Sequence, residues 1–486
     1  MKPYLFQSWL VLAVVCAAAV AAWRLARRKR YVPALFCILL IGLALRLFAN
    51  ADQYLHPWDE CYHALVAKNL MSHPLEPTLV ERPAYDFGPD AWCCTHIWLH
   101  KPPLALWLMA GSMGVFGLSE WALRLPSLLL SLVAIGFTWR MGRLLFNAEV
   151  GLLAAFLHAI NGKLIELAAG RESSDHVETC HVVMFQLAMW FVVLDWKKPE
   201  NKYAVGFGLF AGLAFLSKWT PAFFIPMIWL GGVLWQKRNL SDIMAHAVGM
   251  GIAALAVISP WLVYIYLNFP QESHWVFQFL LKYGDQVVEL HSGEWYFYLD
   301  RLRIMFGELA YLPLLGGLAV LFRRPRSVAW IALAVWLGLP LLLLSAAATK
   351  RETYLLIAAP AFFLLTAYWA RWSWLRFRRY RTYGWGLLAV LLLLLPLRYG
   401  AERAKLFVAR ERRPEWRVRI DRYEQRIRAD GPIEKAALFL YDHPNEMMFY
   451  TGITTYGVLA DDKKIEQLKA EGWRVYVATG DGPERR

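Results

Sequence analysis

Residues able to transfer a proton or bind an anion gather in one polar stretch, residues 56–104, between long apolar runs. Asp59 and Glu60 are adjacent carboxylates, and His63 follows within about one helical turn. A carboxylate beside a reacting hydroxyl can act as its general base. Lys101, at the other end of the stretch, can offset the negative charge of a phosphate. These residue types therefore predict a site that handles both a proton and an anion.

Each of these side chains also has a purely structural interpretation. Asp59 directly precedes a predicted helix over residues 60–70 and can cap its free N–H groups. Lys101 can extend its charge from an apolar segment to the membrane surface. We favour a functional site because two adjacent carboxylates exceed what a cap needs. Ionisable groups beside an apolar run are also costly to keep.

A second set of candidates lies further along the chain. Asp175 and His176 open the apolar run 179–195, where Asp175 and Glu178 also fit the capping box of a helix. His291 is a loop histidine among acidic residues. For these residues the sequence leaves the structural and the functional interpretations open.

Lys350 and Arg351 form a cationic pair just before a predicted helix that starts near Tyr354. The N-terminus of a helix presents unpaired N–H groups and the positive end of a dipole, and both favour anions. We therefore expect this pair to be a second phosphate-binding element.

The elements that position these residues are membrane helices. The chain has 486 residues, of which 58% are hydrophobic and 19% charged, and its mean hydropathy is +0.35. Apolar runs of about 16 to 25 residues recur, bounded by Trp, Tyr, Arg or Lys. These values exclude an ordinary soluble domain and predict a polytopic α-helical membrane protein. The net charge of +14 does not indicate nucleic-acid binding, because the basic residues are mostly confined to short loops.

About twelve transmembrane helices are expected, with both chain ends on the outer side. A cleaved signal peptide is the alternative for the first run, but its basic cluster, residues 24–30, follows the apolar residues instead of preceding them. When that cluster is taken as cytoplasmic, the later basic loops alternate as the positive-inside rule requires. The expected spans are 5–23, 31–50, 121–142, 151–169, 179–195, 203–217, 219–236, 243–267, 304–322, 327–347, 354–372 and 384–399.

The chain divides by composition into two expected domains. Residues 1–400 form a transmembrane domain with long outer loops at 51–120 and 268–303, and residues 401–486 have the composition of a soluble domain on the outer face. A structural lid and a separate binding module are the alternatives for this small α/β domain. Its expected elements are strands at 436–441 and 473–478 and a helix at 462–471.

The order of the motifs resembles the protein mannosyltransferase and lipid A aminoarabinose transferase superfamily, which are integral membrane glycosyltransferases of the GT-C fold. The resemblance spans roughly residues 31–365 and depends on an ordered set whose single pieces are weak. The set comprises Asp59-Glu60, His100-Lys101-Pro102-Pro103-Leu104, Phe116-Gly117-Leu118-Ser119-Glu120, Arg124-Leu125-Pro126-Ser127, Lys350, Tyr354 and Pro360.

The resemblance implies transfer of a sugar from a polyprenyl-phosphate donor, with inversion at the anomeric carbon, at the outer face of a bacterial inner membrane. By position, Asp59 matches the catalytic acidic residue of the family, with Glu60 beside it, and Asp175 resembles a second acidic residue. Lys101 matches a lysine that contacts the donor phosphate. The acceptor is left open as a protein, a lipid or a glycan.

Two positions depart from the pattern of the family. His100 stands where many relatives have an acid, and Tyr62-His63 replaces the Arg-Tyr of aminoarabinose transferases. The resemblance therefore does not fix the sugar. We expect the substrate-binding set to include four histidines, and they are His63, His100, His176 and His291.

The expected partners are the lipid-linked donor, membrane lipids and an acceptor, with no nucleic acid. No cofactor is required, because the donor is already membrane-borne, and a divalent metal ion is an open alternative. The rival function is a transporter or flippase of lipid-linked sugars. Transporters usually carry internal repeats and broken helices at mid-membrane, whereas the polar residues here lie in predicted outer loops.

Overall fold

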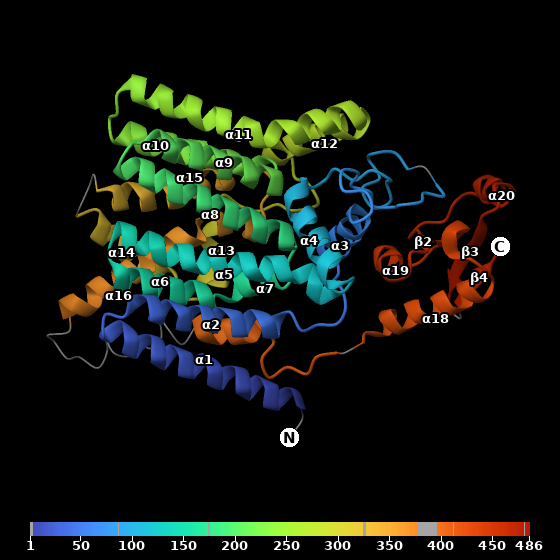
Figure 1. Ribbon diagram of the computed structural model, residues 1–486, viewed down its shortest axis with the longest axis horizontal. Coiled ribbons are helices and arrows are strands. Elements are labelled where there is room, and N and C mark those ends of the chain that lie inside the picture. Colours follow the sequence, from blue (N-terminus) through green and yellow to red (C-terminus); the bar gives the residue numbers. More distant parts are fainter. Residues whose placement is uncertain are drawn as a thin grey trace. The chain divides into compact units, whose positions relative to one another are not determined.

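The computed structural model describes residues 3–85, 87–173, 175–323, 327–377, 396–411, 413–480 and 482–486. The chain is mostly helical and folds into two compact units (Figure 1). The first unit comprises Met1–Ala51, Ser127–Tyr264 and Gln278–Ala409. The second comprises Asp52–Pro126, Ile265–Phe277 and Arg410–Arg486.

The first unit consists mainly of apolar helices. Three of the points at which the sequence passes from one unit to the other fall within helices, namely α5, α11 and α12. The helices α1 and α2 run side by side, as do α8 and α9 (Figure 1). The elements are α1 (Pro3–Arg27), α2 (Tyr31–Ala49), α5 (Glu120–Leu145), α6 (Ala148–Ile160), α7 (Gly162–Ala168), α8 (Asp175–Lys197), α9 (Asn201–Ser217), η1 (Thr220–Phe223), α10 (Phe224–Trp235), α11 (Leu240–Asn268), α12 (Pro270–Asp285), α13 (Phe297–Phe306), α14 (Tyr311–Leu321), α15 (Val328–Ala346), η2 (Glu352–Ala358) and α16 (Ala359–Phe377).

The prediction of a polytopic helical protein is confirmed. Among the described residues, seven helices are long and apolar enough to cross a membrane, or nine if each of two bent helix pairs is one span. The expected count of about twelve is not reached by this measure. Most of the predicted span 384–399 lies outside the described residues.

The predicted span 151–169 corresponds to two helices, α6 and α7, which meet at an angle of 57°. The side chain of Asn161 accepts a hydrogen bond from the N–H of Leu164 at 3.0 Å and so caps a new helix at the break. A capping side chain satisfies an N–H group that a continuous helix would have bonded internally.

The predicted span 304–322 also corresponds to two helices, α13 and α14, which are bent by 106° relative to each other. Gly307 lies between them with a φ of 97°, which a residue with a side chain rarely adopts. The apolar pattern continues across this glycine and across Asn161, so hydropathy alone does not reveal either break.

The second unit contains the outer segment and a small sheet. Its four strands follow the order β2-β1-β3-β4, with β1 parallel to β2 and β3 and with β4 antiparallel to β3. The α/β prediction is confirmed within about two residues at the strand and helix ends. The elements are α3 (Asp59–Leu70), α4 (Pro103–Phe116), α18 (Glu415–Ala429), η4 (Ile433–Lys435), β1 (Ala436–Phe439), α19 (Pro444–Thr451), β2 (Thr454–Thr455), α20 (Asp462–Ala470), β3 (Arg474–Thr479) and β4 (Gly482–Arg485).

The sheet packs against the outer segment inside this unit. Lys68 of α3 donates hydrogen bonds to the carbonyls of Met448 and Phe449 at 2.7 and 2.8 Å. The hydroxyl of Tyr456 accepts a hydrogen bond from the N–H of Ala84 at 2.9 Å. The C-terminal elements thus help to hold the segment in which the Asp59-Glu60 pair lies.

Candidate active site

The Asp59-Glu60 pair begins α3, as the sequence predicts. The N-cap position is Trp58, which makes no side-chain capping hydrogen bond, so Asp59 occupies the first helical position and not the cap. Trp58 has a φ of 71° and is 75% exposed. A backbone in this region costs free energy for a residue with a bulky side chain, and such strain is found preferentially at functional sites.

Glu60 points into the unit and is fully engaged. Arg124 donates from Nε to Glu60 Oε1 at 2.7 Å and from Nη2 to Glu60 Oε2 at 2.9 Å, and both side chains are buried. The N–H of His56 donates to Oε2 at 2.5 Å. Asp59 is partly exposed. The two adjacent carboxylates therefore have different environments, one buried against a guanidinium and one at the surface.

The same arginine holds the chain that leads into α3. Arg124 donates to the carbonyls of Asp52 and Tyr54, each at 2.6 Å. The carboxylate of Asp52 contacts His56 Nε2 at 3.1 Å and Arg410 Nη1 at 3.3 Å. The turn before Asp59 is thus fixed by a buried network of charge-assisted hydrogen bonds.

Aromatic rings lie beside α3. The rings of Tyr62 and Trp98 stack with centroids 6.4 Å apart, and His63 meets Trp98 edge-on at 5.7 Å. His100 contacts Trp98 at 5.2 Å and Trp275 at 5.0 Å. Aromatic faces of this kind suit the apolar face of a sugar or a lipid chain.

His100 is neutral at physiological pH. Burial, aided by the adjacent positive charge of Lys101, lowers the pKa of His100 to about 3. Lys101 itself is partly exposed. The second unit contains all four of the predicted site residues in this segment outside Glu60, which are Asp59, His63, His100 and Lys101.

Asp175 and His176 belong to the first unit and start α8, as expected. Asp175 is buried and its Oδ1 accepts a hydrogen bond from the N–H of Val177 at 3.2 Å. His176 Nδ1 lies 2.8 Å from the hydroxyl of Ser127. Asp175 also has a positive φ of 29°. The geometry is compatible with a role at the helix end and with a role in binding.

The sequence patterns do not reveal the partner of Glu178. Lys218 forms an ion pair with this buried carboxylate, and its Nζ lies 4.4 Å from the centre of the Tyr354 ring. The sequence does contain a sign that Lys218 is important, because this lysine lies between two apolar runs, at a turn predicted to face outward. The contact connects α8 with η2, the element that follows Lys350 and Arg351.

Lys350 and His291 are brought together within the first unit. The N–H of Lys350 donates to the carbonyl of His291 at 2.9 Å. Lys350 is buried and its Nζ donates to the carbonyl of Ala347 at 2.5 Å. Arg351 and His291 both approach Glu289, at 3.9 and 3.8 Å.

Lys350 has no carboxylate within ion-pair distance among the described residues. A buried ammonium is costly unless an anion offsets it. This environment favours an anionic ligand group at Lys350.

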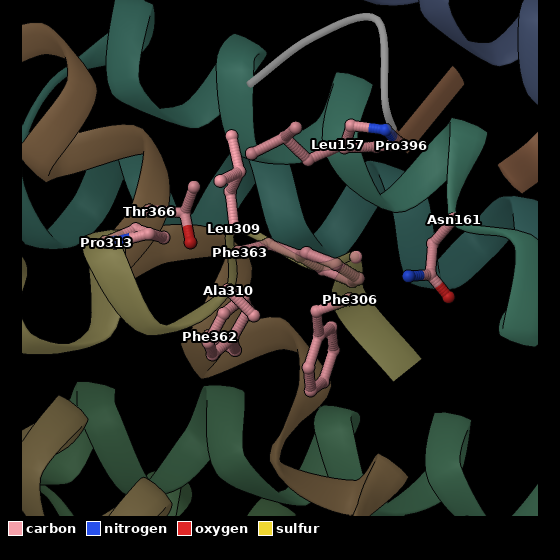
Figure 2. Close-up of a pocket in the computed structure, with 11 residues that line it drawn as sticks. Leu157, Asn161, Phe306, Leu309, Ala310, Pro313, Phe362, Phe363, Thr366 and Pro396 are labelled. Atoms are coloured by element: carbon pink, nitrogen blue, oxygen red, sulfur yellow. The ribbon is translucent and has the colours of Figure 1, made fainter. Parts of the chain in front are cut away.

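A small cavity of about 30 Å³ in the first unit does not coincide with these residues. It lies at the break between α13 and α14 and is lined mainly by apolar side chains such as Phe306 and Phe362 (Figure 2). Asn161 and Thr366 are the polar side chains on its wall. None of the predicted site residues lines it.

Part of the chain matches a family model. Residues 100–264 match the model described as dolichyl-phosphate-mannose-protein mannosyltransferase. An undecaprenyl phosphate-alpha-4-amino-4-deoxy-L-arabinose arabinosyl transferase of Pseudomonas fluorescens is 26% identical over 277 residues, which is 54% of this chain and 49% of the relative. A similar transferase of Pseudomonas aeruginosa is 26% identical over 280 residues, again 54% and 49%. The chain thus spans about half the length of the curated relatives it matches.

Comparison with solved structures establishes the fold of the chain. ArnT from Cupriavidus metallidurans superimposes with a TM-score of 0.66 at 14% identity, over 91% of this chain and 92% of ArnT. The chain has the GT-C fold. The oligosaccharyltransferase of Archaeoglobus fulgidus also matches, with a TM-score of 0.63 at 13% identity over 91% and 69% of the two chains. The resemblance inferred from the motifs is confirmed, and this GT-C protein is an integral membrane protein.

A metal ion is bound in one structure of that oligosaccharyltransferase, a complex with Zn and sulfate. In the part of this GT-C chain that the structure describes, no group of three or more His, Cys, Asp or Glu side chains is arranged to hold a metal.

Proposed function

We propose that the protein is an inverting glycosyltransferase that moves a sugar from a polyprenyl-phosphate donor to an acceptor at the outer face of the membrane. One observation carries this proposal. Within the adjacent pair that begins α3, Glu60 is buried against Arg124, whereas Asp59 is partly exposed beside a strained, exposed Trp58. A rigid helix start that presents one carboxylate is what a general base needs.

In this mechanism Asp59 accepts the proton of an acceptor hydroxyl as the oxygen attacks the anomeric carbon. Glu60 is a positioning residue in this mechanism, because both of its carboxylate oxygens accept hydrogen bonds from Arg124 or His56. The bond from the sugar to the phosphate breaks, and the polyprenyl phosphate leaves with its negative charge. Attack from the face opposite the leaving group inverts the anomeric carbon.

Cations stabilise the leaving phosphate. Lys350 is the strongest candidate because it is buried and lacks a carboxylate partner among the described residues. Arg351 and Lys101 are the further phosphate-binding residues in this proposal. A preorganised charge in a water-poor site acts most strongly on the charge that develops in the transition state.

The remaining predicted residues are assigned to substrate binding. Asp175 is the second acidic residue, and His63, His100, His176 and His291 contact the donor or the acceptor. His100 does so as a neutral imidazole, since its pKa is about 3. A neutral ring can accept as well as donate a hydrogen bond.

The lipid of the donor in this proposal is undecaprenyl phosphate. The relatives are named as transferases of undecaprenyl phosphate-linked aminoarabinose, and one ArnT structure is bound to undecaprenyl phosphate. That ArnT structure matches with a TM-score of 0.64 at 14% identity. The proposal therefore names the lipid of the donor, and the transfer assay described below is used to identify the sugar and the acceptor.

We also propose that the protein lies in a bacterial inner membrane, with loop 51–120 and residues 401–486 on the outer side. Single cysteines at the exposed positions Asp90 and Glu466, in a background without the six native cysteines, test this. Both should react with an impermeant maleimide in intact cells. A cysteine at the exposed Lys198, in a predicted inner loop, should react only after permeabilisation. The reverse pattern would refute the orientation.

A proteoliposome assay separates transfer from the rival transport function. The purified protein is given undecaprenyl-phosphate-linked sugar and an extract of cell-envelope lipids and proteins as the acceptor pool. A transferase releases free undecaprenyl phosphate and adds sugar mass to an acceptor, both seen by mass spectrometry. A flippase instead moves the intact donor to the other leaflet, and finding only that would refute the proposal.

A further inference from the structure

A buried lysine joins two of the segments to which substrate roles are assigned above. Lys163 of α7 is only 3% exposed, and its Nζ forms ion pairs with both Glu172 and Glu352. Glu172 lies three residues before Asp175, and Glu352 directly follows Arg351. All of these residues belong to the first unit.

The positive charge of Lys163 offsets the negative charges of two neighbouring carboxylates. Glu172 and Glu352 are mostly buried, with 17% and 26% of their side chains exposed, and Lys163 is the cation that both contact. The neighbouring Glu166 is served by a different cation, Arg403, at 2.8 and 3.0 Å. Without Lys163, two carboxylates would face each other in a poorly solvated place and repel.

We propose that Lys163 is a positioning residue that holds the segment carrying Asp175 against the segment carrying Lys350 and Arg351. This inference rests on the proposed function, because it assigns substrate contacts to those three residues. Lys163 makes no contact with the substrate in this scheme and acts only through Glu172 and Glu352. A misplacement of about 1 Å at a reacting group can cost about a hundredfold in rate.

Four variants separate this role from general stability. Lys163→Met removes the charge, and Lys163→Arg keeps it in a group that can also bind two carboxylates. A triple variant, Lys163→Met with Glu172→Gln and Glu352→Gln, removes the repulsion as well. Arg371→Met is the matched control, since it breaks the Arg371–Glu149 ion pair of the same unit without touching either segment.

The first measurement is amide hydrogen exchange of the full-length protein in nanodiscs, which needs no activity. Lys163→Met should speed exchange in residues 166–173 and 350–358 together, and the triple variant should restore much of the protection. Lys163→Arg and Arg371→Met should resemble wild type in both segments. Unchanged exchange in Lys163→Met, or faster exchange in only one segment, would overturn the proposal.

The second measurement is sugar transfer. Lys163→Met should lower kcat by about ten- to a hundredfold, the triple variant should recover at least several-fold, and Lys163→Arg should stay close to wild type. Normal kcat in a Lys163→Met protein whose two segments have loosened would refute the positioning role. If wild type itself transfers no sugar, the proposed function fails, while the exchange experiment still decides whether Lys163 joins the two segments.

Discussion

Arg124 Nε lies 2.7 Å from Glu60 Oε1, and both side chains are almost completely buried. The two residues are 64 positions apart in the sequence. Arg124 also donates to the carbonyls that precede α3. The pair therefore fixes the start of the helix on which Asp59 lies and separates the role of Glu60 from that of its neighbour.

Loss of one partner should cost more than loss of both. Arg124→Met leaves a buried carboxylate uncompensated and should destabilise the protein by about 3 to 5 kcal/mol. Arg124→Met combined with Glu60→Gln should recover part of that loss. Thermal unfolding in nanodiscs measures both. A double variant less stable than Arg124→Met alone would show that Glu60 is not the partner that matters.

Lys350→Met should weaken use of the donor. A buried ammonium that offsets the leaving phosphate contributes about 2 to 4 kcal/mol to the transition state, or about thirty- to a thousandfold in kcat/KM. Lys282→Met, which removes an exposed lysine of α12, is the control and should match wild type. Equal kcat/KM for the two variants would remove Lys350 from the mechanism.

His100 should not set the pH dependence of the reaction. Its pKa is lowered to about 3 by burial and by Lys101, so the imidazole stays neutral across the range from pH 5 to 8. The acidic limb of the kcat profile should therefore have the same midpoint in wild type and in His100→Gln. A midpoint that moves by more than about half a pH unit would assign that limb to His100.

Lys68 should make the protein more stable as the pH rises above 8. Burial lowers the pKa of Lys68 from 10.5 to about 8, against the opposing pull of Glu81. The unfolded chain binds more protons than the folded chain between these values, so the free energy of unfolding increases with pH there. The melting temperature of wild type minus that of Lys68→Met should rise from pH 8 to pH 10. A difference that stays constant or falls would contradict this.

Local sequence patterns predicted the helices and strands better than the contacts between side chains. The start of α3, the strand Ala436–Phe439 and the helix Asp462–Ala470 follow from periodicity and turn residues nearby in the chain. The breaks at Asn161 and Gly307 were missed because apolar residues continue on both sides of them.

The candidate site was predictable as a set of residue types but not as a set of contacts. The sequence identifies Asp59, Glu60 and Lys350 as ionisable groups beside apolar runs. It does not reveal that Arg124 pairs with Glu60 or that Lys163 pairs with Glu352, because these residues are 64 and 189 positions apart in the sequence. Long-range pairing depends on tertiary packing, which no local pattern encodes.

The most direct measurement is the rate of sugar transfer by Asp59→Asn in nanodiscs, with undecaprenyl-phosphate-linked sugar and a hydroxyl acceptor. Asn fits the first turn of a helix but cannot accept a proton, so the fold should persist while kcat falls by about a hundredfold or more. Asp90→Asn, at an exposed position of the same segment, is the control and should transfer at the wild-type rate. A well-folded Asp59→Asn protein with wild-type kcat would show that Asp59 is not the general base.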